Sequence, residues 1–213
     1  MAKAKAKARK SARKSGGSKS DPPRADLGQR AIDAAMDLAA REGWGSVTLT
    51  AVAEACGVPL MELYARYPSR TAILAGFARK IDGAVLRGGT TTADAGESPR
   101  DRLFDVMMRR YDAMKPYREA IASIAAEAPR DPLALLCLCG QGRRSMAWML
   151  EAAGIGSGGP LGALKAKGLG AIHLGVLRVW LSDDSEDLGK TMAALDTMLR
   201  RVEPVARTIF ARA

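Results

Sequence analysis

Residues 48–70 read TLTAVAEACGVPLMELYARYPSR, and this stretch predicts two short helices joined by a tight turn. Thr48 is a suitable N-cap for a helix over 49–56, and Gly57 ends that helix because glycine readily adopts the left-handed conformation. Pro59 suits the first turn of a second helix about two turns long. The order of helix, glycine turn and helix is typical of a helix-turn-helix, whose second helix enters the DNA major groove.

Apolar positions at helical spacing flank this motif on both sides. Upstream, they run from Ile32 to Ala39, and Gly43 then ends the predicted helix. Downstream, Ser69 can cap a fourth helix over residues 70–86. We therefore expect a three-helix helix-turn-helix domain that is followed by a linking helix.

The composition of the whole chain favours helices over strands. Of 213 residues, 47% are hydrophobic and only 5% are aromatic, while alanine, leucine and methionine abound. After a loop at residues 88–96, apolar stripes predict helices near 99–115, 116–128, 133–153 and 161–181, and a last one capped by Asp184. The sequence thus predicts an all-α fold with an N-terminal domain at 24–87 and a C-terminal helical domain at 88–213.

The first residues differ in composition from all others. The net charge is +10, and residues 1–20 hold eight basic side chains and no acid, which leaves +2 for the remainder. Because no large apolar side chain follows Met1, we expect residues 1–23 to form a disordered basic tail. Such a tail attracts DNA by releasing counterions, without reading sequence. A solubilising tail without a partner and a mitochondrial transit peptide are the alternatives.

The motif and its flanks resemble the TetR/AcrR family of bacterial transcriptional regulators over residues 28 to 75. The matching residues are Ile32, Ala34, Ala35, Gly43, Trp44, Thr48, Val52 to Ala55, Gly57, Val58, Leu63, Tyr64, Tyr67, Pro68, Ser69, Ile73 and Leu74. The resemblance implies a TetR-like fold of about nine helices, with a DNA-binding domain and a C-terminal domain for ligand binding and dimerisation. It also implies a cytoplasmic dimer that acts as a ligand-responsive repressor at a palindromic operator.

The resemblance further implies roles for individual residues at double-stranded DNA. Thr48, Tyr64 and Arg70 occupy positions that contact phosphates in the family, and Arg66 has the charge to reach a phosphate as well. The positions that face base edges hold Pro59, Leu60, Met61 and Glu62.

Several of these residues depart from the family's pattern. Leu60 and Met61 can contact thymine methyl groups but donate no hydrogen bond, and Glu62 repels phosphate. Residues 21–87 carry eight acidic and eight basic side chains, so this domain adds no net charge. The sequence therefore predicts thin base readout, and a retained fold that has lost DNA binding is the alternative.

Two apolar patterns near the C-terminus predict a helix–helix interface. Gly168, Ala171 and Gly175 share a helix face that permits close approach. In the last helix a heptad-like seam consists of Leu188, Met192, Leu195, Leu199 and Val202. We expect these helices to form a two-fold homodimer, as the family also implies, with packing inside one chain as the alternative.

A set of methionine and aromatic residues in the C-terminal domain is a candidate ligand pocket. It consists of Met107, Met108, Tyr111, Met146, Trp148 and Met149. Such side chains suit an adaptable apolar site, so the expected ligand is a small apolar or amphipathic molecule. Each of these residues alone also suits an ordinary core position.

The sequence gives no support for an enzyme, a cofactor or a metal site. No nucleotide-binding or nucleophile motif occurs, and Cys137 and Cys139 point apart on a helix. His173 has no visible nucleophile partner, so we expect a satisfied core residue. The acidic cluster around Asp184 and Asp187 is interpreted as a helix cap rather than a cation site.

One C-terminal segment supports a different function. Residues 179–188, with Leu195 and Asp196, resemble lipid-binding accessory proteins of ubiquinone biosynthesis, which have a TetR-like fold without specific DNA binding. Tyr64, the Pro68-Ser69 pair and the basic tail favour the DNA-binding interpretation instead.

Overall fold

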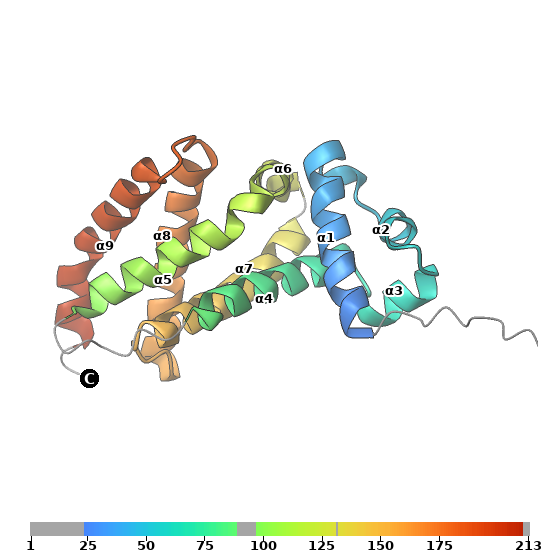
Figure 1. Ribbon diagram of the computed structural model, residues 1–213. Helices are drawn as coiled ribbons and strands as arrows, with labels where there is room; N and C mark the ends of the chain where they lie inside the picture. The colour runs from blue at the N-terminus through green and yellow to red at the C-terminus, as the bar shows by residue number, and fades with distance from the viewer. Residues whose placement is uncertain (1–23, 89–96, 131, 211–213) are drawn as a thin grey trace, which may run out of the picture.

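All regular structure in the described residues is helical (Figure 1). The computed structural model describes residues 24–88, 97–130 and 132–210. The α-helices are α1 (Arg24–Glu42), α2 (Leu49–Cys56), α3 (Leu60–Arg66), α4 (Arg70–Arg87), α5 (Pro99–Met114), α6 (Arg118–Glu127), α7 (Pro132–Ala152), α8 (Gly159–Leu181) and α9 (Gly189–Phe210). Three 3-10 turns lie between them, namely η1 (Trp44–Ser46), η2 (Lys115–Tyr117) and η3 (Ala128–Arg130).

The predicted all-α class is therefore confirmed for this part of the chain. The basic tail expected at residues 1–23, and most of the loop expected at 88–96, lie outside the described residues. Among the described helices, none combines the length and the apolar character that crossing a membrane requires.

The first three helices form a small unit, here called the head, and its apolar core also includes Ala120 of α6. Figure 1 shows α1, α2 and α3 together at one end of the molecule, with α6 next to α1. Helices α5 to α9 are here called the body. Ile32 and Met36 of α1 pack with Trp44 of η1, Val52 of α2 and Leu63 of α3, and all five are buried. The two short helices are thus fixed against α1 by apolar contact rather than by their own stability.

The linking helix α4 belongs to both cores. Ile73 and Leu74, near its beginning, are buried in the head, whereas Ile81 and Val85 are buried in the body. The two apolar clusters therefore meet within α4, and the domain boundary expected at residue 87 stays a prediction.

One buried ion pair ties α4 to the body. Arg110 of α5 donates to the carboxylate of Asp82 in α4 across 2.5 Å, and the Ser145 hydroxyl of α7 donates to the same oxygen. All three residues are buried. A buried charge that loses its partner costs several kcal/mol, so these side chains strongly favour one arrangement of the three helices.

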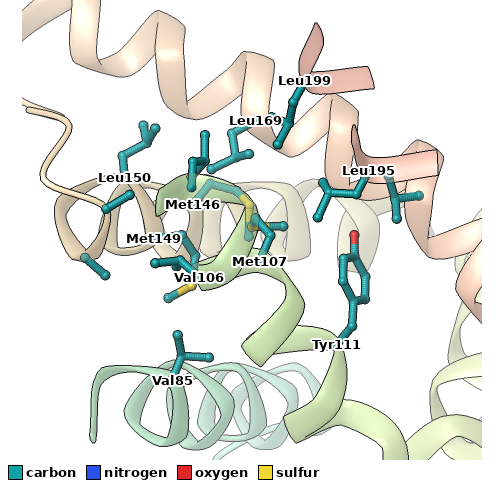
Figure 2. Packing of buried hydrophobic residues seen from close by; sticks show 14 of the residues in the cluster. Val85, Val106, Met107, Tyr111, Met146, Met149, Leu150, Leu169, Leu195 and Leu199 are labelled. Carbon is teal, nitrogen blue, oxygen red and sulfur yellow. The ribbon is translucent and has the colours of Figure 1, made fainter. Parts of the chain in front are cut away.

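The body core lies between α5, α7, α8 and α9, with the second half of α4 along one side (Figure 2). Met107 and Tyr111 of α5, Met146 and Met149 of α7, and Leu195 of α9 are at most 1% exposed. Leucine is the most frequent residue in this cluster, and Met107, Met114, Met146 and Met149 add unbranched side chains that fill irregular gaps between the helices.

The structure corrects two expectations about the last helices. The seam of α9 does not need a partner chain, because Leu188, Leu195 and Leu199 are buried in the core of their own chain. Residues 161–181 are apolar on nearly every side, which predicts a fully buried helix, but in α8 Leu164 and Leu174 are 51% and 59% exposed. A run of apolar residues identifies covered faces poorly when the helix is apolar on every side.

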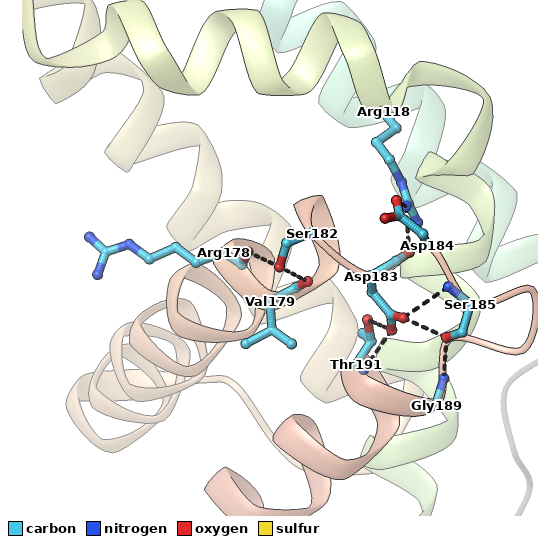
Figure 3. Close-up of polar contacts among 9 residues, drawn as sticks. All are labelled: Arg118, Arg178, Val179, Ser182, Asp183, Asp184, Ser185, Gly189 and Thr191. Carbon is cyan, nitrogen blue, oxygen red and sulfur yellow. Dashed lines mark hydrogen bonds and ion pairs between the residues drawn. The ribbon is translucent and has the colours of Figure 1, made fainter.

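Asp183, and not Asp184, caps α9. The carboxylate of Asp183 accepts hydrogen bonds from the backbone N–H and the hydroxyl of Thr191, at 2.8 and 2.7 Å, and from the backbone N–H of Ser185 at 3.2 Å (Figure 3). Asp184 points to solvent, with its carboxylate 3.9 Å from Arg118. The capping role moves by one residue because α9 begins only at Gly189, after a turn that brings Asp183 back over the helix start.

Replacing Asp183 by alanine should destabilise the body, whereas Asp184→Ala should have almost no effect. The expected loss for Asp183→Ala is about 2 kcal/mol, because an N-cap and buried hydrogen bonds disappear together. Chemical denaturation of both variants, followed by circular dichroism, measures the difference. Equal stabilities would contradict the capping role assigned to Asp183.

The stability lost in the Asp183→Ala variant should depend on pH. Although burial raises the pKa of Asp183, its hydrogen bonds with Ser185 and Thr191 outweigh burial and hold that pKa below the ordinary value of 3.8. Its stabilising contribution is therefore complete above that pH and is lost as the pH falls further, toward the lower pKa of the folded state. The stability gap between the wild type and Asp183→Ala should narrow in acid.

Candidate nucleic-acid interface

The turn between α2 and α3 has the geometry that its sequence predicts. The Thr48 Oγ1 atom accepts a hydrogen bond from the backbone N–H of Ala51 at 3.0 Å, which caps α2. Gly57 ends α2 in the left-handed conformation, with φ 64° and ψ 35°. Pro59 is the N-cap of α3 rather than its first residue, a shift of one position from the expectation.

Helix α3, the predicted recognition helix, is anchored through its inner face. Leu63 is fully buried and Tyr67 is 2% exposed. The Tyr67 hydroxyl donates to the carbonyl oxygen of Gly28 in α1 at 3.3 Å. Gly76 of α4 makes room for it, since a Cβ at that position would lie 2.8 Å from the Tyr67 hydroxyl oxygen. Tyr67 therefore joins α1, α3 and α4.

The outer face of α3 is largely apolar. Leu60, Met61 and Tyr64 are 46%, 75% and 56% exposed, and Glu62 is exposed beside them. The structure therefore brings together on one surface the residues predicted to face base edges and the Tyr64 predicted at phosphate. Apart from the backbone, this face offers a phenol, a carboxylate and apolar contact, which suits thymine methyl groups better than guanine edges.

The two predicted phosphate-binding arginines are held by the protein itself. The Arg66 guanidinium lies against Gly28 and 5.1 Å from the centre of the Tyr67 ring. Arg70 donates through Nη1 to the carbonyl oxygen of Trp44 at 3.1 Å, and its guanidinium carbon lies 5.4 Å from the centre of the indole ring. Contacts of this kind fix a guanidinium in position before it meets an anion.

Two helix N-termini add positive potential to the head. Thr48 caps α2 and Ser69 caps α4, where its Oγ accepts from the backbone N–H of Ala72 at 3.1 Å. Neither helix has an acidic residue in its first turn. Both N-termini therefore favour a nearby anion such as a phosphate, while the acidic Glu62 in the first turn of α3 opposes one.

The comparisons with known proteins agree with this geometry. Residues 31–76 match the family model described as bacterial regulatory proteins, tetR family. This segment therefore resembles the N-terminal domain of the TetR family. The matched range runs from α1 to the first third of α4 and therefore holds the whole helix-turn-helix. No curated protein matches the chain.

Solved structures extend the likeness beyond this segment. A TetR transcriptional regulator from Nitrosomonas europaea superposes with a TM-score of 0.65 at 20% identity, covering 83% of this chain and 97% of that one. A TetR transcriptional regulator from Rhodococcus sp. RHA1 gives 0.59 at 22% identity, covering 82% and 97%. The body thus shares the TetR fold, which is all that identities this low establish.

Residues that contact one another between head and body were not predicted from the sequence. Lys80 of α4 pairs with Asp33 of α1, and the Tyr117 hydroxyl of η2 donates to Asp33 at 3.4 Å. The backbone N–H of Trp44 donates to the Ser123 hydroxyl of α6 at 2.7 Å. No spacing rule finds such contacts, because their partners are 47 or more residues apart in the chain.

The charge on Lys80 is stabilised at this contact. Burial alone would lower its pKa, but hydrogen bonds with Asp33 and Tyr117 outweigh burial and raise the pKa above its ordinary value. Lys80 also lies 4.9 Å from the centre of the Tyr117 ring. The cation therefore persists at any physiological pH and links α1, α4 and η2.

The predicted ligand-pocket residues are only partly brought together. Met107, Tyr111, Met146 and Met149 lie in the buried body core, and Met108 packs at its edge. Trp148 is 53% exposed and does not join them. Tyr111 faces His173, with 2.9 Å between the hydroxyl oxygen and Nδ1, so His173 is the satisfied residue that the sequence predicts. Burial, with the nearby charge of Arg110, lowers the pKa of His173 to about 3, which keeps the ring neutral.

Gly76→Ala should destabilise the head, whereas Gly83→Ala on the same helix should not. A methyl group at Gly76 would lie 2.8 Å from the Tyr67 hydroxyl and 3.1 Å from Cδ1 of Ile32, but at Gly83 the nearest atom is 3.6 Å away on Arg87. We expect a loss of about 1–3 kcal/mol for Gly76→Ala and a gain of up to about 1 kcal/mol for Gly83→Ala. Thermal and urea unfolding measure both, and a stabilised Gly76→Ala variant would disprove the anchoring role of Tyr67.

Proposed function

We propose that this protein is a DNA-binding transcriptional regulator, and specifically a ligand-responsive repressor in the cytoplasm. The observation that carries the proposal is a TetR-like domain whose recognition helix exposes Tyr64 beside two capped helix N-termini. In this proposal Thr48, Tyr64, Arg66 and Arg70 contact phosphates. Apolar contact by Leu60 and Met61, with Pro59 and Glu62, supplies modest base readout.

The basic tail adds affinity that is independent of sequence. The head has no net charge over residues 21–87, so little long-range attraction to DNA comes from it. Residues 1–20 carry eight basic side chains, which would neutralise phosphates and release counterions. Specificity therefore resides in α3 and affinity largely in the tail.

We further propose that the protein acts as a homodimer through α8. Leu164 and Leu174 are exposed on α8, and Gly168 and Ala171 are exposed between them. This spacing gives a helix face with two large apolar side chains and a small-residue centre, which suits close packing against a second copy. Gly175 is excluded from the face, because a Cβ there would lie 2.8 Å from Met198 of α9. A two-fold axis at α8 would present two heads to a palindromic operator.

Repression would be relieved by a ligand that favours a head arrangement unable to fit two adjacent major grooves. The methionine-rich core around Met107, Met146 and Met149 is the proposed site for a small apolar ligand, with Tyr111 in the same core and Met108 at its margin. Because these side chains fill the core, a ligand would enter only as the methionines change rotamer.

DNA binding is tested with fragments from the protein's own genomic neighbourhood. We expect one fragment to bind tightly in moderate salt and to remain bound when residues 1–20 are removed, although more weakly. Tyr64→Ala and Arg70→Ala should each weaken binding about tenfold, since each removes a phosphate contact of about 1.4 kcal/mol. Fluorescence anisotropy over a series of salt concentrations measures all of these quantities.

Matched controls separate the interface from general effects. Trp148→Ala removes an exposed aromatic side chain and Arg143→Ala an exposed arginine, both on α7 of the body. Neither substitution should change DNA affinity. Binding that ignores sequence, falls steeply with salt and vanishes with the tail would refute a specific regulator and favour the lipid-binding accessory protein.

The proposed dimer is tested by introducing a charged side chain on the exposed face of α8. Leu174→Glu places a carboxylate in the proposed interface and should convert the dimer into a monomer, because the charge would be buried without a partner. Leu136→Glu is the control, since Leu136 is 70% exposed on α7. Size-exclusion chromatography with light scattering reports the mass, and a dimer that survives Leu174→Glu rules out this face.

A further inference from the structure

A cavity of about 590 Å³ lies where the head meets the body. Its head wall comes from η1 and from the beginnings of α2 and α4, and its body wall from α6, η3 and α7. Its volume falls in the range of about 300–1,000 Å³ that is usual for small-molecule sites. The cavity is separate from the methionine-rich core, with which it shares no lining residue.

Part of the cavity wall is apolar. Trp44, Leu49 and Leu74 line it from the head, and Ile124 and Leu138 line it from the body. An aliphatic chain or a ring would contact both walls at once. Apolar burial of this kind supplies most of the affinity in small-molecule sites, while a few polar groups select the ligand.

Two guanidinium groups lie at the same cavity. Arg70 is preorganised by its hydrogen bond with the Trp44 carbonyl and by the indole ring. Arg130 of η3 donates only a 3.4 Å hydrogen bond, to the carbonyl oxygen of Ala126, among the described residues. Within the described part of the chain, neither arginine has a carboxylate within 4.0 Å.

Among the described residues, one carboxylate lines the cavity, that of Glu127. Glu127 lies against the turn of Gly43 and Gly45, where a Cβ at Gly45 would be 2.9 Å from its Oε2 atom. Among the described residues, two arginines against one glutamate give the lining a net positive charge. The first residues of α2 and α4 also line the cavity, and neither helix has an acid in its first turn to offset its positive end.

We infer that this cavity binds a small amphipathic anion, a carboxylate attached to an apolar chain or ring. The apolar part lies between Trp44, Leu74 and Ile124, and the carboxylate is bound by the guanidinium groups of Arg70 and Arg130. Binding itself does not depend on the protein being a regulator. One consequence does rest on the proposed function: because Arg70 is also a proposed phosphate contact, such an anion would compete with DNA for it.

Calorimetric titration of the full chain with sodium octanoate tests the site, with 1-octanol and octylammonium as neutral and cationic probes of the same length. We expect octanoate to bind at least tenfold more tightly than either of the others. Arg130→Gln should weaken octanoate binding about tenfold, and Arg143→Gln, at an exposed arginine outside the cavity, should leave it unchanged. Leu138→Trp, which fills the cavity from its α7 wall, should abolish binding.

Each contrary result overturns the inference. The inference is wrong if octanoate does not bind at millimolar concentration, or if 1-octanol binds equally tightly. It is also wrong if Arg130→Gln binds octanoate as tightly as the wild type, or if Leu138→Trp still binds it. Thermal unfolding of the variants verifies that they are folded. If octanoate binds as expected while no DNA fragment does, the ligand site stands and the regulator proposal falls, so the two failures are distinguishable.

Discussion

The pairing of Asp82 with Arg110 is the contact on which the arrangement of this molecule depends. It lies inside the body, yet Asp82 belongs to the helix whose beginning is part of the head core. Removing either partner would leave a charge buried without compensation, at a cost of about 3–5 kcal/mol. Ser145 adds a third helix to the same carboxylate. The direction in which α4 leaves the body, and hence the position of the head, is therefore set by a polar contact inside an apolar core.

A second set of contacts supports the head from the other side. Lys80, Asp33 and Tyr117 join α1, α4 and η2 near the surface, and Ser123 of α6 holds the backbone of Trp44. The surface ion pair is worth little by itself, since solvent screens it. Helix α6 also packs against α1, with Ala120 buried in the head core. The junction thus combines one strongly fixed helix, an apolar helix pair and several weak polar contacts, and the cavity between head and body lies beside them.

Local signals in the sequence predicted the head well. Thr48, Gly57 and Ser69 each act through the backbone within a few residues, so spacing alone located α2 and the start of α4. Prediction failed where the partner of a side chain had to be known. The apolar seam of α9 was expected at a second chain, with packing inside one chain as the alternative, and Leu188, Leu195 and Leu199 are buried in their own chain while Val202 is 42% exposed. Trp148 was grouped with buried methionines although it is 53% exposed. Asp183 was missed as a cap because the start of α9 depends on a turn that no local pattern fixes.

The apolar outer face of α3 has a thermodynamic consequence for any complex that the head forms. Leu60, Met61 and Tyr64 expose about half or more of their surface to water in the free protein. Association through this face would dehydrate hydrocarbon, and dehydration of hydrocarbon lowers the heat capacity. The enthalpy of binding would therefore become steadily more favourable on warming. For an interface made only by lysine and arginine, the main signature would instead be an affinity that falls with salt concentration.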